Sequence, residues 1–113
     1  MIDNPEKTDI LIERLENSLP IETRLSQPLV RMLTRESPDI SIPGKCNVTK
    51  ISYAGDEGGV LCWLNIGGAE SKSAHIVSIT HLRFDRHIPL AREIDAYQRH
   101  RIKKIKQQDA RGF

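Results

Sequence analysis

The residues suited to catalysis or metal binding are few and lie far apart in the chain. They are two cysteines and two of the four histidines, Cys46, Cys62, His75 and His81. Zinc sites draw their ligands from short, recognisable spacings, and neither CxxC nor HxxxH occurs here. We therefore expect no metal site and no cofactor. Two cysteines in a chain of 113 residues do not make a disulfide framework, so we expect free thiols that pack like small hydrophobic side chains.

The only candidate nucleophile with a nearby base lies in the stretch from Ser78 through Thr80 to His81. On a strand, alternate side chains point to opposite faces, which separates both hydroxyls from the imidazole. A nucleophile must lie within hydrogen-bond reach of its base. The glycine-rich stretch 55–59 lacks the lysine of a phosphate-binding loop and the oxygen ligands of a calcium loop, and it is typical of a hairpin turn. We therefore expect that the protein is not an enzyme.

Positive charge near the end of the chain is the strongest functional signal. Residues 1–43 carry a net charge of −3, residues 44–85 are neutral, and residues 86–113 carry +5. Clustered cations neutralise phosphates and complement acidic protein surfaces. The side chains that we expect to bind a partner are Arg92, Arg99, Arg101, Lys103, Lys104 and Lys106.

This basic segment has more than one interpretation. Lysine and arginine are good helix formers, and they are common on any helix face exposed to water. Alternatively, the acidic first segment of the chain could dock against them. We expect an acidic protein partner first, including a second copy bound through its acidic N-terminal helix. DNA or RNA is the alternative, although RNA-binding proteins usually expose aromatic rings. The chain has five aromatic residues, four of which we expect in the core: Tyr53, Trp63, Phe84 and Tyr97.

Hydrophobic periodicity predicts the elements that position these residues. Residues 5–19 and 27–35 place apolar side chains at helical spacing, with a proline suited to each first turn. The pattern then changes to short runs rich in β-branched and aromatic residues, separated by glycine-containing turns. These runs predict three antiparallel strands at 46–53, 59–66 and 74–84, with 40–42 as a candidate fourth.

The last predicted element is a long amphipathic helix over residues 89–107, about 28 Å in length at 1.5 Å per residue. Asp95 precedes Arg99 by four residues, the favourable order for a surface ion pair. The expected buried stripe consists of Leu90, Ile94, Tyr97, Ile102 and Ile105.

We therefore expect one α+β domain over residues 1–113. It comprises a helical segment at 1–36, an antiparallel meander or small bent barrel of three to four strands at 45–84, and the basic helix at 89–107. A hairpin centred on residues 56–57 pairs Cys62 with Ile51 and leaves Cys46 facing position 67. Trp63 is expected in the core against Leu90 or Ile94, and an exposed Trp63 would instead mark an interface.

No apolar run approaches the roughly 20 residues of a membrane span. The start, MIDNPEKTD, lacks the basic and then apolar layout of a secretory signal, so we expect a soluble cytoplasmic protein with no membrane partner. The stretches VTKISYAGDEGG (48–59) and VSITHLRF with PLAREIDAYQRHRIKKI (77–84 and 89–105) resemble a family of small uncharacterised cyanobacterial proteins. The resemblance covers roughly the C-terminal two-thirds of the chain. It implies a cytosolic bacterial protein without an assigned activity and transfers no site residue.

Overall fold

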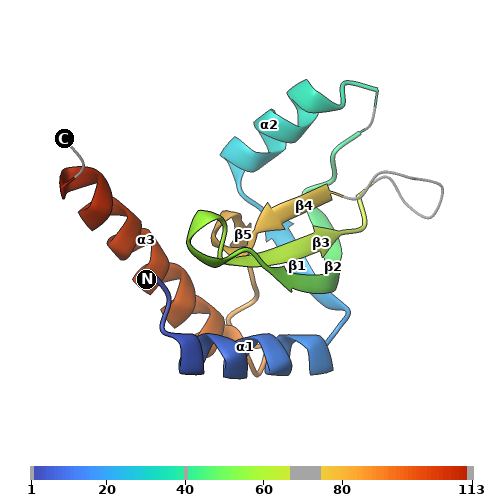
Figure 1. The fold of residues 1–113 in the computed structure, drawn as a ribbon. Helices are drawn as coiled ribbons and strands as arrows, with labels where there is room; N and C mark the ends of the chain where they lie inside the picture. Colours follow the sequence, from blue (N-terminus) through green and yellow to red (C-terminus); the bar gives the residue numbers. More distant parts are fainter. Residues whose placement is uncertain (1, 40, 67–74, 112–113) are drawn as a thin grey trace.

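A five-stranded antiparallel sheet and three α-helices make up the part of the chain that the computed structural model describes, residues 2–39, 41–66 and 75–111 (Figure 1). The strands are β1 (Ile21–Leu25), β2 (Lys45–Tyr53), β3 (Val60–Leu64), β4 (His75–Ser78) and β5 (Leu82–Arg83), in the order β4-β3-β2-β1-β5. The helices are α1 (Pro5–Asn17), α2 (Gln27–Glu36) and α3 (Ala91–Arg111). The predicted α+β class is confirmed, with five strands rather than three or four.

The predicted meander is present as β2, β3 and β4, each antiparallel to the next. Ile51 pairs with Cys62, as the hairpin centre predicts. Position 67, predicted to face Cys46 across the hairpin, lies outside the described residues; on the other side of β2, Cys46 pairs with Thr23 of β1, a strand that the sequence analysis did not predict. The alternating burial of β1 is that of a half-buried strand, but five residues between two helices are a weak signal. Of the candidate strand 40–42, residue 40 lies outside the described residues and residues 41–42 form no strand.

The third strand predicted over 74–84 is present as β4, but its predicted length is wrong, because the chain turns within that stretch. Residue 74 lies outside the described residues, and β4 ends at Ser78, whose hydroxyl accepts a hydrogen bond from the backbone N–H of Thr80. The short 3₁₀ helix η2 (Ile79–His81) then redirects the chain into β5. As a result β4 and β5 lie at opposite edges of the sheet, which curls into a half-barrel.

The core lies between one face of the sheet and the three helices. Along β3, alternate side chains such as Cys62 and Leu64 are buried, and the residues between them are partly exposed. α1 lies below the strands and α2 above them in Figure 1, while α3 crosses at the left. The helices, together with the residue that precedes α3, supply one continuous set of buried side chains to this core: Leu11, Leu15, Leu29, Leu33, Leu90, Ile94 and Tyr97.

The C-terminal part of α3 extends beyond the core. Leu90, Ile94 and Tyr97 of the predicted stripe are buried, but Ile102 is 41% exposed and Ile105 is half-buried. Figure 1 shows the end of α3 projecting away from the sheet and from the other helices. The prediction of Ile102 as a core residue is therefore wrong, because the domain offers no surface opposite that turn. No helix in the described ranges is both long enough and apolar enough to span a bilayer.

Candidate interaction surface

A buried polar cluster fixes α3 to the rest of the domain. The Asp3 carboxylate, fully buried, accepts hydrogen bonds from Nη1 of Arg101 at 3.2 and 3.3 Å. The hydroxyls of Tyr97 and Tyr53 donate to the same carboxylate at 2.7 and 2.9 Å. Buried charges are tolerated when they are paired and hydrogen-bonded, and each of these groups satisfies another. The cluster therefore joins the N-terminal segment, β2 and α3 at one point.

The residues around this cluster extend the same connection to the β2–β3 turn. Nη2 of Arg101 donates to the backbone oxygen of Asp56 at 2.8 Å, and the Asp56 carboxylate accepts from the backbone N–H of Ile2 at 2.9 Å. Nε2 of His100 lies 3.1 Å from the backbone oxygen of Ile2. The N-terminal segment is thus held between α3 and η1 (Gly55–Glu57), and it sets the position of α3.

The turn itself approaches this cluster closely at Gly59. Its φ of +65° lies in the left-handed region, which glycine adopts without strain. A Cβ at this position would collide with the Tyr97 hydroxyl and lie 2.8 Å from Cζ of Arg101. Glycine is therefore required both by the backbone conformation and by the close packing of the cluster.

The electrostatics of the cluster are those of a structural anchor. Burial, and to a lesser extent the hydrogen bond to Asp3, raise the pKa of Tyr53 to about 12. Burial also raises the pKa of Tyr97, again with a contribution from Asp3. Both phenols therefore remain neutral donors near pH 7. A buried carboxylate that is already neutralised by a guanidinium and bound by two phenols offers no free base.

Arg101 consequently does not belong to the partner-binding surface that the sequence predicts. Its side chain is 3% exposed and its charge is paired with Asp3. Arg99 lies on the outer side of α3, where its side chain is 81% exposed and forms the predicted ion pair with Asp95 at 3.1 Å. Arg92 is also exposed. Arg101, one of the six predicted partner-binding residues, is therefore a core residue, because a carboxylate 98 positions away in the chain pairs with it.

The remaining predicted cations lie on the projecting end of α3, which we define as residues 102–108. Lys103, Lys104 and Lys106 are exposed, and none forms an ion pair with the side chains that the structure describes. Ile102 and Ile105 lie on the same stretch. The structure thus brings three of the six predicted residues together on an open helix end.

α1 does not neutralise this helix end. The ion pair that joins the two helices runs from Arg14 of α1 to Glu93 of α3, the reverse of the predicted polarity. A hydrogen bond from its own backbone N–H and the Arg14 guanidinium lower the pKa of Glu93. The acidic residues of α1 are exposed instead: Glu6, Asp9, Glu13 and Glu16.

The candidate catalytic and metal-binding residues do not converge. His75 is buried and His81 exposed, on different elements, and Ser78 Oγ lies 3.0 Å from Thr80 Oγ1 within the η2 turn. Among residues 2–39, 41–66 and 75–111, no group of three His, Cys, Asp or Glu side chains could hold a metal ion. Cys46 and Cys62 are free thiols whose pKa values burial raises to about 11 and about 12.

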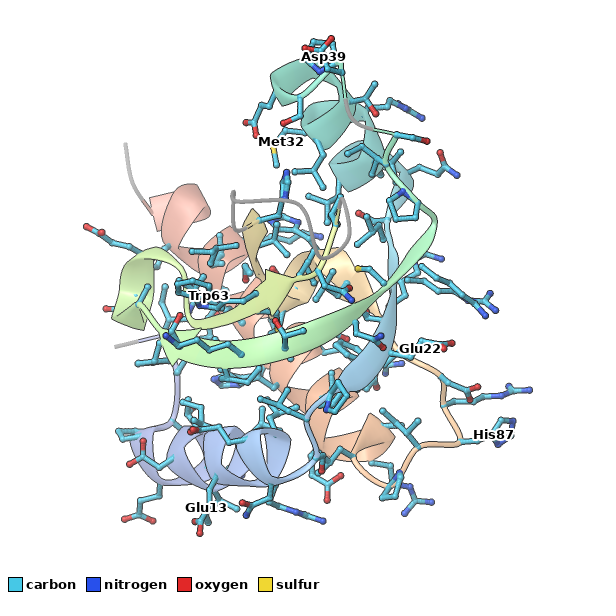
Figure 2. All side chains as sticks on the ribbon, turned by 90° about the vertical axis from the view of Figure 1, so that its right-hand side faces the viewer. Glu13, Glu22, Met32, Asp39, Trp63 and His87 are labelled. Atoms are coloured by element: carbon cyan, nitrogen blue, oxygen red, sulfur yellow. The ribbon has the colours of Figure 1, made fainter. Side chains whose placement is uncertain are left out.

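Trp63 lies on the outer side of the sheet rather than in the core, which corrects the prediction that it packs against Leu90 or Ile94 (Figure 2). It is half-buried: its indole N–H donates to Ser52 Oγ at 3.1 Å, and Lys50 Nζ lies 4.5 Å from the ring centroid. Strand alternation decides this orientation, because Cys62 takes the inward position next to it.

A second cationic surface, which the sequence analysis did not identify, lies across β1, β2 and β5. We call it the basic hollow. It has a volume of about 530 Å³, and Figure 2 shows Glu22 and His87 on the same side of the molecule. Its cations come from distant parts of the chain, so only strand pairing could reveal it. It is lined by Glu22, Thr23, Arg24, Lys45, Arg83, Phe84, Asp85, Arg86, His87 and Ile88.

Comparisons of this chain with family models, with curated proteins and with solved structures found no match. The resemblance to the cyanobacterial family therefore stays a prediction.

Proposed function

We propose that the protein is a non-enzymatic binding module that contacts an acidic protein surface through the projecting end of α3. The observation that supports this most strongly is the position along α3 beyond which its side chains are no longer buried against the domain. Among the side chains of α3 that the structure describes, which end at residue 108, Arg101 is the last buried one, and those after it are exposed or half-buried. The domain does not need these turns for its own packing, yet they carry Lys103, Lys104 and Lys106.

The composition of the projecting end favours a protein partner over a nucleic acid. Ile102 and Ile105 are three positions apart and therefore share a helix face. Lys103 and Lys106, also three apart, form a neighbouring face. An amphipathic helix of this kind binds in an apolar groove with an acidic rim, where the isoleucines provide contact area and the lysines complement the rim. A phosphate backbone would use the lysines and leave the isoleucines in water.

The chain itself supplies an acidic helix surface of this kind. Asp9, Glu13 and Glu16 of α1 follow one another at spacings of four and three residues, so they share a face. Ile10, next to this face, is 58% exposed. No described ion pair joins these carboxylates to the projecting end within one chain. We therefore propose a second copy of the chain as the partner, with α1 of one copy binding α3 of the other.

We also propose that the protein is located in the cytoplasm. Reducing conditions there keep thiols such as Cys46 and Cys62 unpaired, and both are free in this fold. We also propose that this module is non-enzymatic. The buried polar cluster supports this, because the Asp3 carboxylate is paired with Arg101 and bound by two neutral phenols, which leaves no free base for catalysis.

Sedimentation velocity tests the proposal with a charge swap. The wild-type chain should associate at about 50 mM salt and dissociate as salt approaches about 200 mM, because exposed ion pairs are screened. Lys103→Glu/Lys104→Glu/Lys106→Glu should be monomeric, and so should Asp9→Lys/Glu13→Lys/Glu16→Lys, each with a melting temperature close to that of the wild type. Mixing the two variants should restore association, since the swapped charges complement each other.

The control reverses charge elsewhere. Arg31→Glu/Arg35→Glu changes two exposed cations of α2 and should associate like the wild type. A wild-type chain that stays monomeric at low salt would overturn the proposed partner. So would association that survives both charge reversals, or a mixture of the two variants that stays monomeric.

A further inference from the structure

Three cations lie in one row across the basic hollow. Arg24 of β1 is directly opposite Lys45 of β2 on one side and directly opposite Arg83 of β5 on the other. All three side chains are exposed. Like charges directly opposite each other on neighbouring strands destabilise a sheet. The row therefore lowers the stability of the free protein, and an anion bound across it would remove the repulsion.

The hollow supplies too few carboxylates to neutralise this row. Glu22 pairs with Lys45 at 3.4 Å, but both side chains are more than half exposed, so the pair contributes little. One Asp85 oxygen accepts a hydrogen bond from the backbone N–H of His87 at 2.8 Å within a turn. Arg24 and Arg83 form no ion pair with the described side chains. Arg86, also exposed, adds a fourth cation to the lining.

We infer that the basic hollow binds the phosphate groups of a single-stranded nucleic acid. Neighbouring strands lie about 4.8 Å apart, so a row across three strands spans about 10 Å, more than one phosphate needs. Three of the four cations are arginines, whose planar guanidinium groups bind phosphate through two parallel hydrogen bonds. Phe84 and the exposed His87 line the same hollow and offer rings against which a base can stack.

The chemistry of this surface differs from that of the projecting end of α3. The helix end carries lysines beside exposed isoleucine, which suits a protein groove, whereas the hollow carries arginines beside aromatic and imidazole rings. The two surfaces share no residue. The inference is therefore independent of the proposed function.

Fluorescence anisotropy with a labelled single-stranded RNA of about 16 nucleotides, the upper range for one small domain, tests the inference. The wild-type chain should bind at about 50 mM salt and lose at least about tenfold in affinity by about 200 mM. Arg24→Gln/Arg83→Gln should bind at least about tenfold more weakly, and its salt slope should fall by about 1.4 because each lost contact releases about 0.7 counterions. The melting temperature of this variant should equal or exceed that of the wild type, since the cross-strand repulsion is gone.

The matched control removes two arginines from α2. Arg31→Gln/Arg35→Gln has the same net charge as the hollow variant and should bind within about twofold of the wild type. Lack of RNA binding by the wild type at low salt would overturn the inference, and so would equal losses in the two variants. Displacement of the RNA by inorganic phosphate at matched ionic strength would also overturn it, because it would identify a site for a small anion.

Discussion

Breaking the ion pair between Asp3 and Arg101 should destabilise the whole domain. Asp3→Asn preserves the shape of the side chain and removes its charge, which leaves the Arg101 guanidinium 3% exposed with only the Asp56 backbone oxygen as a strong acceptor. Removing one partner of a buried pair is destabilising because the other charge stays in a medium of low dielectric constant.

The expected size of the effect follows from burial and chain length. Breaking a buried pair costs about 3 to 5 kcal/mol in the free energy of unfolding. Unfolding entropy is about 2.1 cal/mol/K per residue, so for 113 residues each kcal/mol lowers the melting temperature by about 4 °C. The Asn variant should therefore melt about 12 to 20 °C below the wild type.

A double-mutant cycle with urea denaturation measures the interaction itself. Asp3→Asn, Arg101→Met and the double variant should give a coupling energy of about 2 kcal/mol, because the double variant no longer buries an unpaired charge. A single substitution that costs less than about 1 kcal/mol, or two effects that add within about 0.5 kcal/mol, would refute the claim that this pair anchors α3.

The neighbours of this pair give further expectations. Tyr97→Phe should lower the free energy of unfolding, measured by urea denaturation, by about 1 to 3 kcal/mol, because a buried backbone N–H of β3 loses its acceptor. Tyr53→Phe should lower it less, because Tyr53 lies at the surface. Since the pKa values of both phenols are raised, their contribution to stability is full below pH 10. The contribution of Tyr53 is lost as pH rises through about 12 and that of Tyr97 at still higher pH, so the double Phe variant should lose less stability above pH 10 than the wild type. Gly59→Ala should lower the melting temperature more than a substitution at an exposed position does. The alanine would have to adopt a positive φ, and its Cβ would collide with the Tyr97 hydroxyl. In thiol-reactivity assays Cys62 should react only on unfolding, and the half-buried Cys46 should react faster but still slowly.

Much of the secondary structure was predictable because its signals are local. The apolar spacing and the prolines predicted α1 and α2, and β-branched runs around a glycine turn predicted β2 and β3 with the observed Ile51–Cys62 pairing. β1 and β5 were not predicted, since two to five residues carry little periodicity and their pairing partners lie elsewhere in the chain.

The α+β class, the hairpin pairing of Ile51 with Cys62 and the position of α3 could be derived from local sequence patterns, because each depends on residues close together in the chain. The environment of each charge, in contrast, depends on how the elements pack. Asp3 and Arg101 are 98 positions apart, and only the fold makes their pair a core interaction rather than two surface charges. Arg24, Lys45 and Arg83 form a row only because strands β2, β1 and β5 pair side by side. Electrostatic interactions act over a few ångströms of space regardless of separation in sequence, so composition can count cations but cannot show which of them remain available to a partner.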